Sequence, residues 1–142
     1  MKLSEHFTLA EFTRSTTATA RGIKNEPTAE VIANLQYLVT TVLEPLRVAM
    51  GHAVPIGSGY RCKALNTAVG GVSNSQHLTG QAADLCISGD KAKGQKWYNW
   101  IKSNVPYDQL IWERNKKTGS YWVHVSVKKS GNRKQAIPLL DK

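Results

Sequence analysis

The sequence predicts a single α+β domain, in which a mostly antiparallel sheet is flanked by helices and the N-terminal half contains one long helix. Three observations predict this class. Residues 27–50 carry a long apolar repeat at helical spacing, helical patterns separate the strand-like segments that follow, and the last two segments alternate like a hairpin. The chain has 142 residues, 41% of them hydrophobic. That size fits one domain over residues 1–142, and the apolar fraction suffices for a core without a disulfide framework.

The first elements are predicted to be helical. Thr8 and Glu11 have the spacing of a capping box and predict a short helix. Residues 15–25 lack periodicity and predict a loop. Residues 27–50 place apolar side chains every three or four positions, which predicts a long helix. Pro45 should kink or break this helix near its end, because proline lacks the amide hydrogen and its ring crowds the preceding turn.

Shorter elements fill the rest of the chain. Alternating patterns predict strands and periodic patterns predict helices. The expected strands are residues 54–60, 82–87, 109–113 and 121–127, of which the last two form a closing hairpin. The expected helices are residues 63–69 and 90–103, with a polar loop over residues 72–80.

The net charge of +9 comes from 19 lysines and arginines against 10 acidic residues. A positive excess favours an anionic partner, such as nucleic acid or the anionic polymers of a bacterial wall, and it also serves solubility. We expect no nucleic-acid binding, because the basic residues form only short pairs without a zinc-finger spacing, an aromatic RNA-binding motif or a basic helix. No apolar run approaches the ~18 residues that a membrane-spanning helix needs, so no membrane partner is expected.

The first residues contain no apolar signal-peptide core. We therefore expect a protein that is made in the cytoplasm, is monomeric, and reaches any substrate in the cell wall only after release. Cys62 and Cys86 are not spaced as a CxxC pair and lie near predicted core segments, which favours buried free thiols over a bridge. His6 and His52 carry no motif and are expected at the surface.

A loop with one histidine leads to an acidic residue on the following strand. His77 and Asp84 lie on either side of Gly80, which lets the backbone turn tightly. Further along, His124 interrupts an apolar alternating strand, where a histidine is unusual unless something occupies it. Two imidazoles and one carboxylate would form a catalytic zinc set, because the fourth coordination position stays open for water.

Catalysis at such a centre needs a general base, and Glu113 is the candidate because it ends the strand that pairs with the His124 strand. Each of these residues also has an ordinary structural interpretation. His77 and Asp84 fit a loop or a helix cap, His124 fits a hydrogen-bonded core histidine, and Glu113 fits a solvated carboxylate. The spacing alone leaves both interpretations open.

The segment SQHLTGQAAD, residues 75–84, resembles the SxHxxGxAxD motif of the zinc D-Ala-D-Ala peptidase superfamily, with all five fixed positions present. That superfamily includes VanX-type dipeptidases, zinc D-Ala-D-Ala carboxypeptidases, phage L-Ala-D-Glu endolysins and the hedgehog signalling domain. Residues 58–61, SGYR, resemble the segment that precedes the motif, and residues 108–126 resemble the closing hairpin. The resemblance spans residues 7–127 and is closest to small phage or prophage endolysin-type members.

The resemblance implies a hedgehog-like or D-Ala-D-Ala-peptidase-like α+β fold. It implies a metallopeptidase with Zn2+ as cofactor that hydrolyses a peptide bond in bacterial peptidoglycan stem peptides, as a carboxypeptidase or as an endolysin-like endopeptidase. His77, Asp84 and His124 would hold the zinc, and Glu113 would be the catalytic base.

Two substrate-binding roles also follow from the resemblance. Arg61 would bind a substrate carboxylate, which suits its guanidinium fork, and Ser75 would hydrogen-bond the substrate. Many members carry an acidic residue three positions before the last histidine, or a histidine two positions before it, where this chain has Tyr121 and Trp122. The alternative is therefore a non-catalytic zinc-containing wall-binding or virion protein of the same fold. A nucleic-acid-binding domain is a further alternative, supported only by charge.

Overall fold

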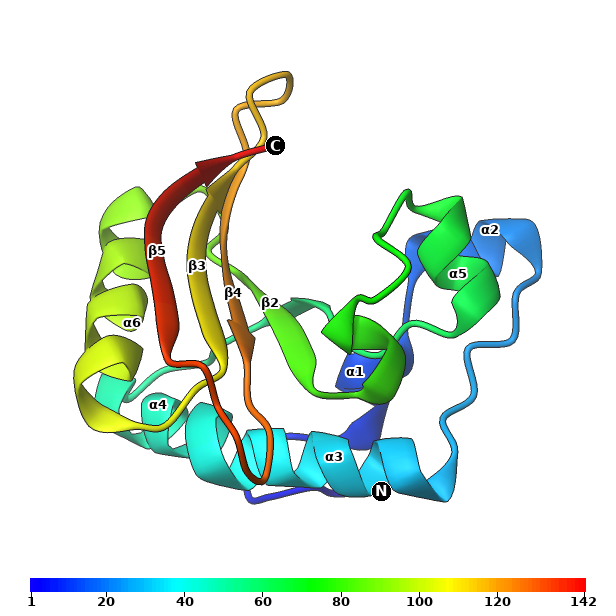
Figure 1. Ribbon diagram of the computed structural model, residues 1–142, viewed down its shortest axis with the longest axis horizontal. Helices are drawn as coiled ribbons and strands as arrows, with labels where there is room; N and C mark the ends of the chain where they lie inside the picture. Colours follow the sequence, from blue (N-terminus) through cyan, green and yellow to red (C-terminus); the bar gives the residue numbers. More distant parts are fainter.

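A computed structural model describes residues 1–142, which form one five-stranded sheet with helices around it (Figure 1). The helices are α1 (Leu9–Thr13), α2 (Thr16–Arg21), α3 (Ala29–Leu38), α4 (Glu44–Met50), α5 (Lys63–Ala68) and α6 (Lys91–Asn104), with a π-helical turn η1 (Val39–Leu43) and a 3-10 turn η2 (Gln76–Thr79). The strands are β1 (Ile56–Ser58), β2 (Ala82–Cys86), β3 (Gln109–Arg114), β4 (Tyr121–Ser126) and β5 (Gln135–Asp141).

The strand order is β1-β2-β4-β3-β5, and every neighbouring pair is antiparallel except β3 with β5. The predicted α+β class with a mostly antiparallel sheet is therefore confirmed. The prediction that the hairpin closes the sheet is wrong, because β5 adds a parallel strand beside β3. This strand escapes pattern analysis because it lies at the sheet edge and is mostly exposed, and because it contains Pro138, which lies at a register irregularity of the pairing with β3.

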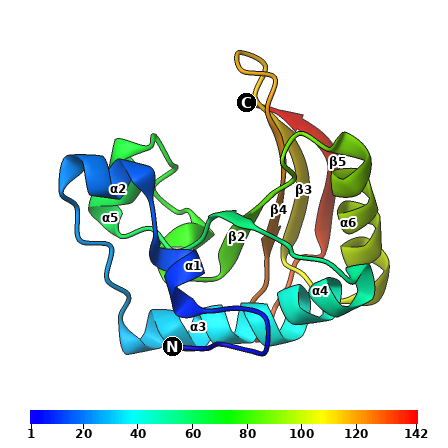
Figure 2. The ribbon, with the colours of Figure 1, turned by 180° about the vertical axis from the view of Figure 1, so that it is seen from behind.

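Helix α6 covers one face of the sheet (Figures 1 and 2). The side chains beneath it alternate along their strands, and Leu110 and Val123 of this face are fully buried. Gly94 of α6 lies so close to the sheet that an added Cβ would come within 2.4 Å of the Trp112 ring. The face of the sheet away from α6 is therefore the one left for a site.

The predicted long helix runs from residue 29 to residue 50 as α3, η1 and α4. Its apolar stripe is core, since Leu35 and Leu46 are fully buried. Pro45 does not break the helix, because residues 29–50 stay helical without interruption. Instead, the helix widens to a π turn over η1, where the Glu44 amide donates to the Val39 carbonyl five residues back. A π turn of this kind lets the helix pass a proline without an intact α-helical bond at every position.

Local predictions in the N-terminal part are partly right. The capping box of Thr8 and Glu11 is present and begins α1. The loop predicted for residues 15–25 is wrong, because residues 16–21 form α2. Two short-range features stabilise this helix: the Ser15 hydroxyl accepts from the Ala18 amide at 3.2 Å, and Gly22 ends the helix in the left-handed conformation.

The strand predicted over residues 54–60 is shorter in the structure. It pairs with β2 only through Ile56 and Ser58, with a register shift between them. Cys62 and Cys86 are free, as predicted, but they are half-buried rather than buried. None of the helices combines the length and apolarity that a bilayer crossing requires.

Candidate metal centre

Three strands bring polar side chains to the face of the sheet away from α6. Asp84 on β2 lies directly opposite His124 on β4, and His124 in turn lies opposite Ile111 on β3. Side chains of a strand point to alternate faces, so Glu113, two residues beyond Ile111 in β3, lies on the same face as Ile111. Asp84, His124 and Glu113 therefore project from the same side of the sheet.

The turn η2 supplies a fourth polar group, His77. Its first residue is preceded by Ser75, whose hydroxyl accepts from the His77 amide at 3.2 Å, and it ends at Gly80, which adopts φ +75°. The long helix supports this turn from below, since the Asn34 amide group donates to the Thr79 carbonyl at 2.9 Å. These contacts hold His77 with only 3% of its surface exposed.

The orientation of the His77 ring is set by a hydrogen bond. Nδ1 donates to the Gly59 carbonyl at 2.6 Å, so Nε2 is the ring nitrogen left to serve as a ligand once it is deprotonated. Gly59 itself packs against Phe12, where an added Cβ would come within 2.6 Å of the Phe12 carbonyl oxygen, so a larger residue would disturb this position. A backbone carbonyl behind a ligating histidine is the usual arrangement in metal sites.

The potential ligand atoms of His77, Asp84 and His124 all lie within 4.8 Å of one another. His77 Nε2 lies 3.4 Å from Asp84 Oδ2, and His124 Nδ1 donates to Asp84 Oδ1 at 2.9 Å. The structure thus brings together the three residues that the sequence singled out. Two nitrogens and one oxygen are a donor set that suits Zn2+, and three protein ligands beside a cavity define a candidate catalytic centre rather than a structural one.

The electrostatics of the cluster fit a cation. Burial alone would raise the pKa of Asp84, but the charge of His77 and the hydrogen bond from His124 outweigh it and hold this pKa well below its ordinary value. Asp84 is therefore a carboxylate at neutral pH. A metal ion would replace the shared proton between Asp84 and His124, because ligands must be deprotonated to bind.

A cavity of about 490 Å³ opens in front of these three residues. All six site residues expected from the sequence line it: Arg61, Ser75, His77, Asp84, Glu113 and His124. The remaining wall includes Leu140 and Lys142 from the C-terminal end of the chain, which the sequence analysis did not single out. A cavity of this size holds several residues of a peptide.

Glu113 is almost fully buried, with 3% of its surface exposed. Burial and the negative charge of Asp84 raise the pKa of Glu113, while His124 and Lys142 oppose that rise. The Lys142 ammonium lies 3.6 Å from Glu113 Oε2. Glu113 is thus not a solvated surface carboxylate, which was the ordinary structural alternative for this residue. A raised pKa is what a general acid–base residue requires near neutral pH.

Arg61 borders the metal ligands and is held by three protein partners. Its guanidinium donates to Ser58 Oγ at 3.2 Å and to Asn66 Oδ1 at 3.0 Å, and its Nη2 lies 3.6 Å from Asp84 Oδ2. Its backbone amide also donates to the His77 carbonyl at 3.0 Å. Arg61 therefore presents a cation to the cavity and fixes the η2 turn, while its contact with a substrate carboxylate stays a prediction.

Asp108 is a buried carboxylate behind the site, with no exposed surface. It accepts from Gln76 Nε2 at 3.0 Å and from Arg133 Nη2 at 2.6 Å, so it ties the η2 turn to the segment that leads into β5. The hydrogen bonds from Arg133 outweigh burial and lower the pKa of Asp108 to about 2. No motif marks this residue, because its partners lie far away in the sequence.

An α+β domain whose sheet carries a three-residue ligand set facing a cavity has the architecture of a metal-dependent hydrolase. Comparison with known proteins agrees with that class. The Peptidase M15 family model matches residues 5–126. The chain belongs to the Peptidase M15 family, and β5 lies beyond the matched residues.

One relative is the zinc D-Ala-D-Ala carboxypeptidase of Streptomyces albus G. It is 39% identical to this chain over 82 residues, which cover 56% of this chain and 31% of the relative. The chain thus matches less than a third of the relative's length.

Proposed function

We propose that this protein is a zinc-dependent peptidase that hydrolyses a peptide bond in bacterial peptidoglycan stem peptides, in a carboxypeptidase-like or endolysin-like manner. One observation carries the proposal. His77, Asp84 and His124 converge within 4.8 Å in a cavity that also contains the buried carboxylate of Glu113. Membership of the Peptidase M15 family and the likeness to a zinc D-Ala-D-Ala carboxypeptidase support this substrate class.

The proposed chemistry divides between the metal and the protein. A zinc ion at the three ligands supplies Lewis-acid chemistry, because it polarises a peptide carbonyl and makes a water molecule more acidic. Glu113 takes a proton from the attacking water and delivers it to the leaving amine. The burial that raises the pKa of Glu113 favours this second transfer, since a carboxylic acid with a raised pKa holds its proton until the amine receives it.

Arg61 and Ser75 orient the substrate in this proposal. Arg61 lies beside Asp84 and offers its guanidinium to a substrate carboxylate. Ser75 lines the same wall, where its hydroxyl is already engaged with the His77 amide and has its own proton free to donate. A peptide with a free carboxylate fits such a wall better than a neutral one.

Digestion of purified peptidoglycan tests the proposal. The protein is incubated with it, with and without a chelator, and the soluble fragments are identified by mass spectrometry. A new fragment that the chelator abolishes and added zinc restores is the expected result, and its mass identifies the bond that is cut. Fragments that persist unchanged in the chelator would refute a metal-dependent peptidase.

A second candidate is a zinc-containing wall-binding or virion protein without turnover. It is favoured by the positions before His124, where Tyr121 and Trp122 stand in place of an acidic residue or a histidine. One zinc per chain together with binding to peptidoglycan, but no fragment from any preparation, would select this candidate.

A further inference from the structure

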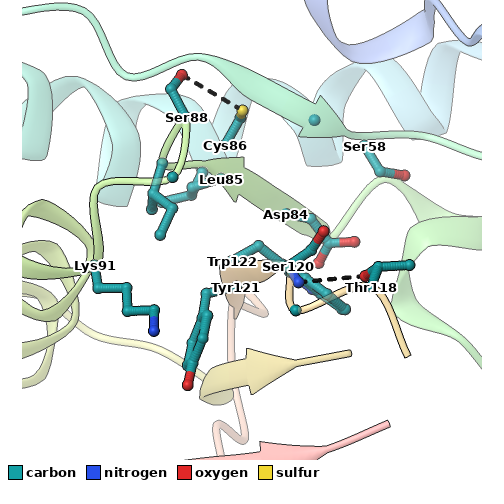
Figure 3. A pocket seen from close by; sticks show the side chains of 14 residues that line it. Ser58, Asp84, Leu85, Cys86, Ser88, Lys91, Thr118, Ser120, Tyr121 and Trp122 are labelled. Atoms are coloured by element: carbon teal, nitrogen blue, oxygen red, sulfur yellow. Dashed lines mark hydrogen bonds between the residues drawn. The ribbon is translucent and has the colours of Figure 1, made fainter. Parts of the chain in front are cut away.

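A second cavity adjoins the candidate metal centre. Its volume is about 510 Å³, and Asp84 lines both cavities. It lies where β2 ends, between the chain that leads to α6 and the turn that joins β3 to β4 (Figure 3). Its lining residues include Ser58, Ser88, Lys91, Thr118, Ser120 and Tyr121.

The lining of this cavity is mixed, with apolar surface from Leu85, Ile87 and Trp122 beside the hydroxyl-bearing residues, and it carries little charge. Apart from Asp84, which belongs to the ligand set, Lys91 is its one ionic side chain. The hydroxyl-bearing residues named above surround it, and hydroxyls both donate and accept. In Figure 3, Lys91 and Tyr121 lie on one side of the cavity, Ser58 and Thr118 on the other, and Asp84 between them.

The Lys91 ammonium is held against an aromatic ring, but no carboxylate neutralises its charge. Its Nζ lies 4.5 Å from the centre of the Tyr121 ring, in a cation–π contact. It forms no ion pair with any carboxylate, whereas nearby Arg114 is engaged with Asp141 at 2.6 Å and donates to the Tyr121 hydroxyl at 3.3 Å. Lys91 is thus a cation held at a cavity wall with its charge available to a ligand.

The cavity follows the chain from Asp84 to Gly89. At the rise of an extended strand, the first four of these residues span roughly 10 Å, which is about the length of three residues of an extended peptide. Asp84 lies on the face of the metal ligands, whereas Tyr121 packs on Trp112 on the α6 face, so the cavity passes around the end of β2. A peptide whose scissile bond lies at the metal ligands would therefore reach Lys91 by passing the end of this strand.

We propose that this cavity is a substrate subsite, in which Lys91 binds a carboxylate that the stem peptide carries about two or three residues from the scissile bond. The inference rests on the proposed function and deepens it. The subsite makes the protein selective for peptides longer than a dipeptide and for peptides with an acid at that distance. Two sources of the carboxylate have the same chemistry: the free α-carboxylate of a γ-linked glutamate and the second carboxylate of a diamino acid.

The test uses synthetic stem peptides and the zinc-loaded protein. We expect kcat/KM to rise at least ten-fold from the dipeptide to the pentapeptide. We also expect a peptide with a carboxylate to be cleaved about ten-fold better than the same peptide with that group amidated, which is the usual worth of one charge-assisted hydrogen bond. Amidating the glutamate and the diamino acid in separate peptides shows which of the two carboxylates Lys91 binds.

Variants assign the effect to Lys91. Lys91→Met is expected to bring the ratio between carboxylate and amide peptides close to one, and Lys91→Arg is expected to keep most of it. Lys93→Met is the matched control, because Lys93 lies on the same helix turn and makes a similar contact, 5.3 Å from the Trp97 ring, but does not line the cavity. This control is expected to keep the ratio of the unmodified protein.

Two results would overturn the subsite while leaving the proposed function standing. One is chelator-sensitive cleavage of the dipeptide as efficient as that of the pentapeptide. The other is a carboxylate-to-amide ratio that survives in Lys91→Met. If no peptide is cleaved, the proposed function fails, and calorimetry on the same peptide pair decides about the subsite. Tighter binding of the carboxylate peptide that Lys91→Met abolishes supports it, and equal affinities refute it.

Discussion

The ammonium of Lys142 lies 3.6 Å from Oε2 of Glu113, across the wall of the cavity that holds the candidate metal ligands. The backbone of Lys142 is held in place at the end of β3, where its amide donates to the Arg114 carbonyl at 2.8 Å. The pairing of β5 with β3 therefore places the Lys142 ammonium, directly after β5, beside the proposed base. This strand lies outside residues 5–126, which match the family.

Replacing Lys142 by Met should move the acidic limb of the pH–rate profile to higher pH. Lys142 is among the groups that lower the pKa of Glu113, and the proposed base acts only when it is deprotonated. The shift should be larger at low ionic strength, because the Lys142 side chain is 57% exposed and screened by salt. Lys116→Met is the control, since Lys116 pairs with Asp141 and not with Glu113. A profile that stays unchanged in Lys142→Met would show that the ion pair does not tune Glu113.

Glu113→Gln should lower kcat by about 100-fold or more, which is the usual contribution of a positioned acid–base group. The zinc content should remain one per chain, because Glu113 is not among the three ligand residues. Metal analysis and peptide hydrolysis on the same preparation check both statements. Full activity of this variant would assign the base to another residue or to a water molecule.

The same substitution should stabilise the metal-free fold at neutral pH. The pKa of Glu113 is raised in the folded state, so the protonated form favours folding, and that contribution is lost as pH rises through the folded pKa. Glutamine keeps the shape without the buried charge. Thermal unfolding in a chelator should give Glu113→Gln the higher Tm at pH 7, and the difference should shrink as pH falls through the raised folded pKa and reach its minimum below the ordinary value of 4.5. A variant less stable than the unmodified protein at pH 7 would contradict this account.

His77→Ala should abolish stoichiometric zinc binding and peptide hydrolysis. Three protein ligands leave no substitute when one is lost, and His77 is oriented for the role by its bond to the Gly59 carbonyl at 2.6 Å. Metal analysis after dialysis measures the outcome. His52→Ala is the matched control, because His52 is exposed and lies outside the cavity. Unchanged zinc content in His77→Ala would remove His77 from the ligand set.

Asp108→Asn should destabilise the fold by about 2 kcal/mol at neutral pH, the order of magnitude that a pKa of about 2 implies for a buried carboxylate. The pKa is lowered in the folded state, so this stabilisation is present above the ordinary value of 3.8 and lost as pH falls through about 2. Denaturant unfolding at pH 7 and pH 3 checks the sign. Asp141→Asn, at an exposed pair, should change stability much less.

Much of the fold could be predicted from local pattern. The periodic stripe of residues 29–50, the Asp90-capped helix α6 and the alternating hairpin are visible in the sequence because each buries one regular face. Two elements, α2 and β5, were missed for different reasons. Helix α2 is too short to show a period, and β5 is stabilised by pairing with β3 rather than by an apolar pattern of its own.

The sequence by itself determined which residue types stand at the candidate site, because the motif around His77 and Asp84 and the lone histidine in an apolar strand are local features. Only the tertiary structure decided that these residues meet. The pairing of Asp84 with His124 spans 40 positions, and the contact of Glu113 with Lys142 depends on a strand added at the sheet edge. Distances of this kind are set by strand register and packing between distant segments, which no local pattern encodes.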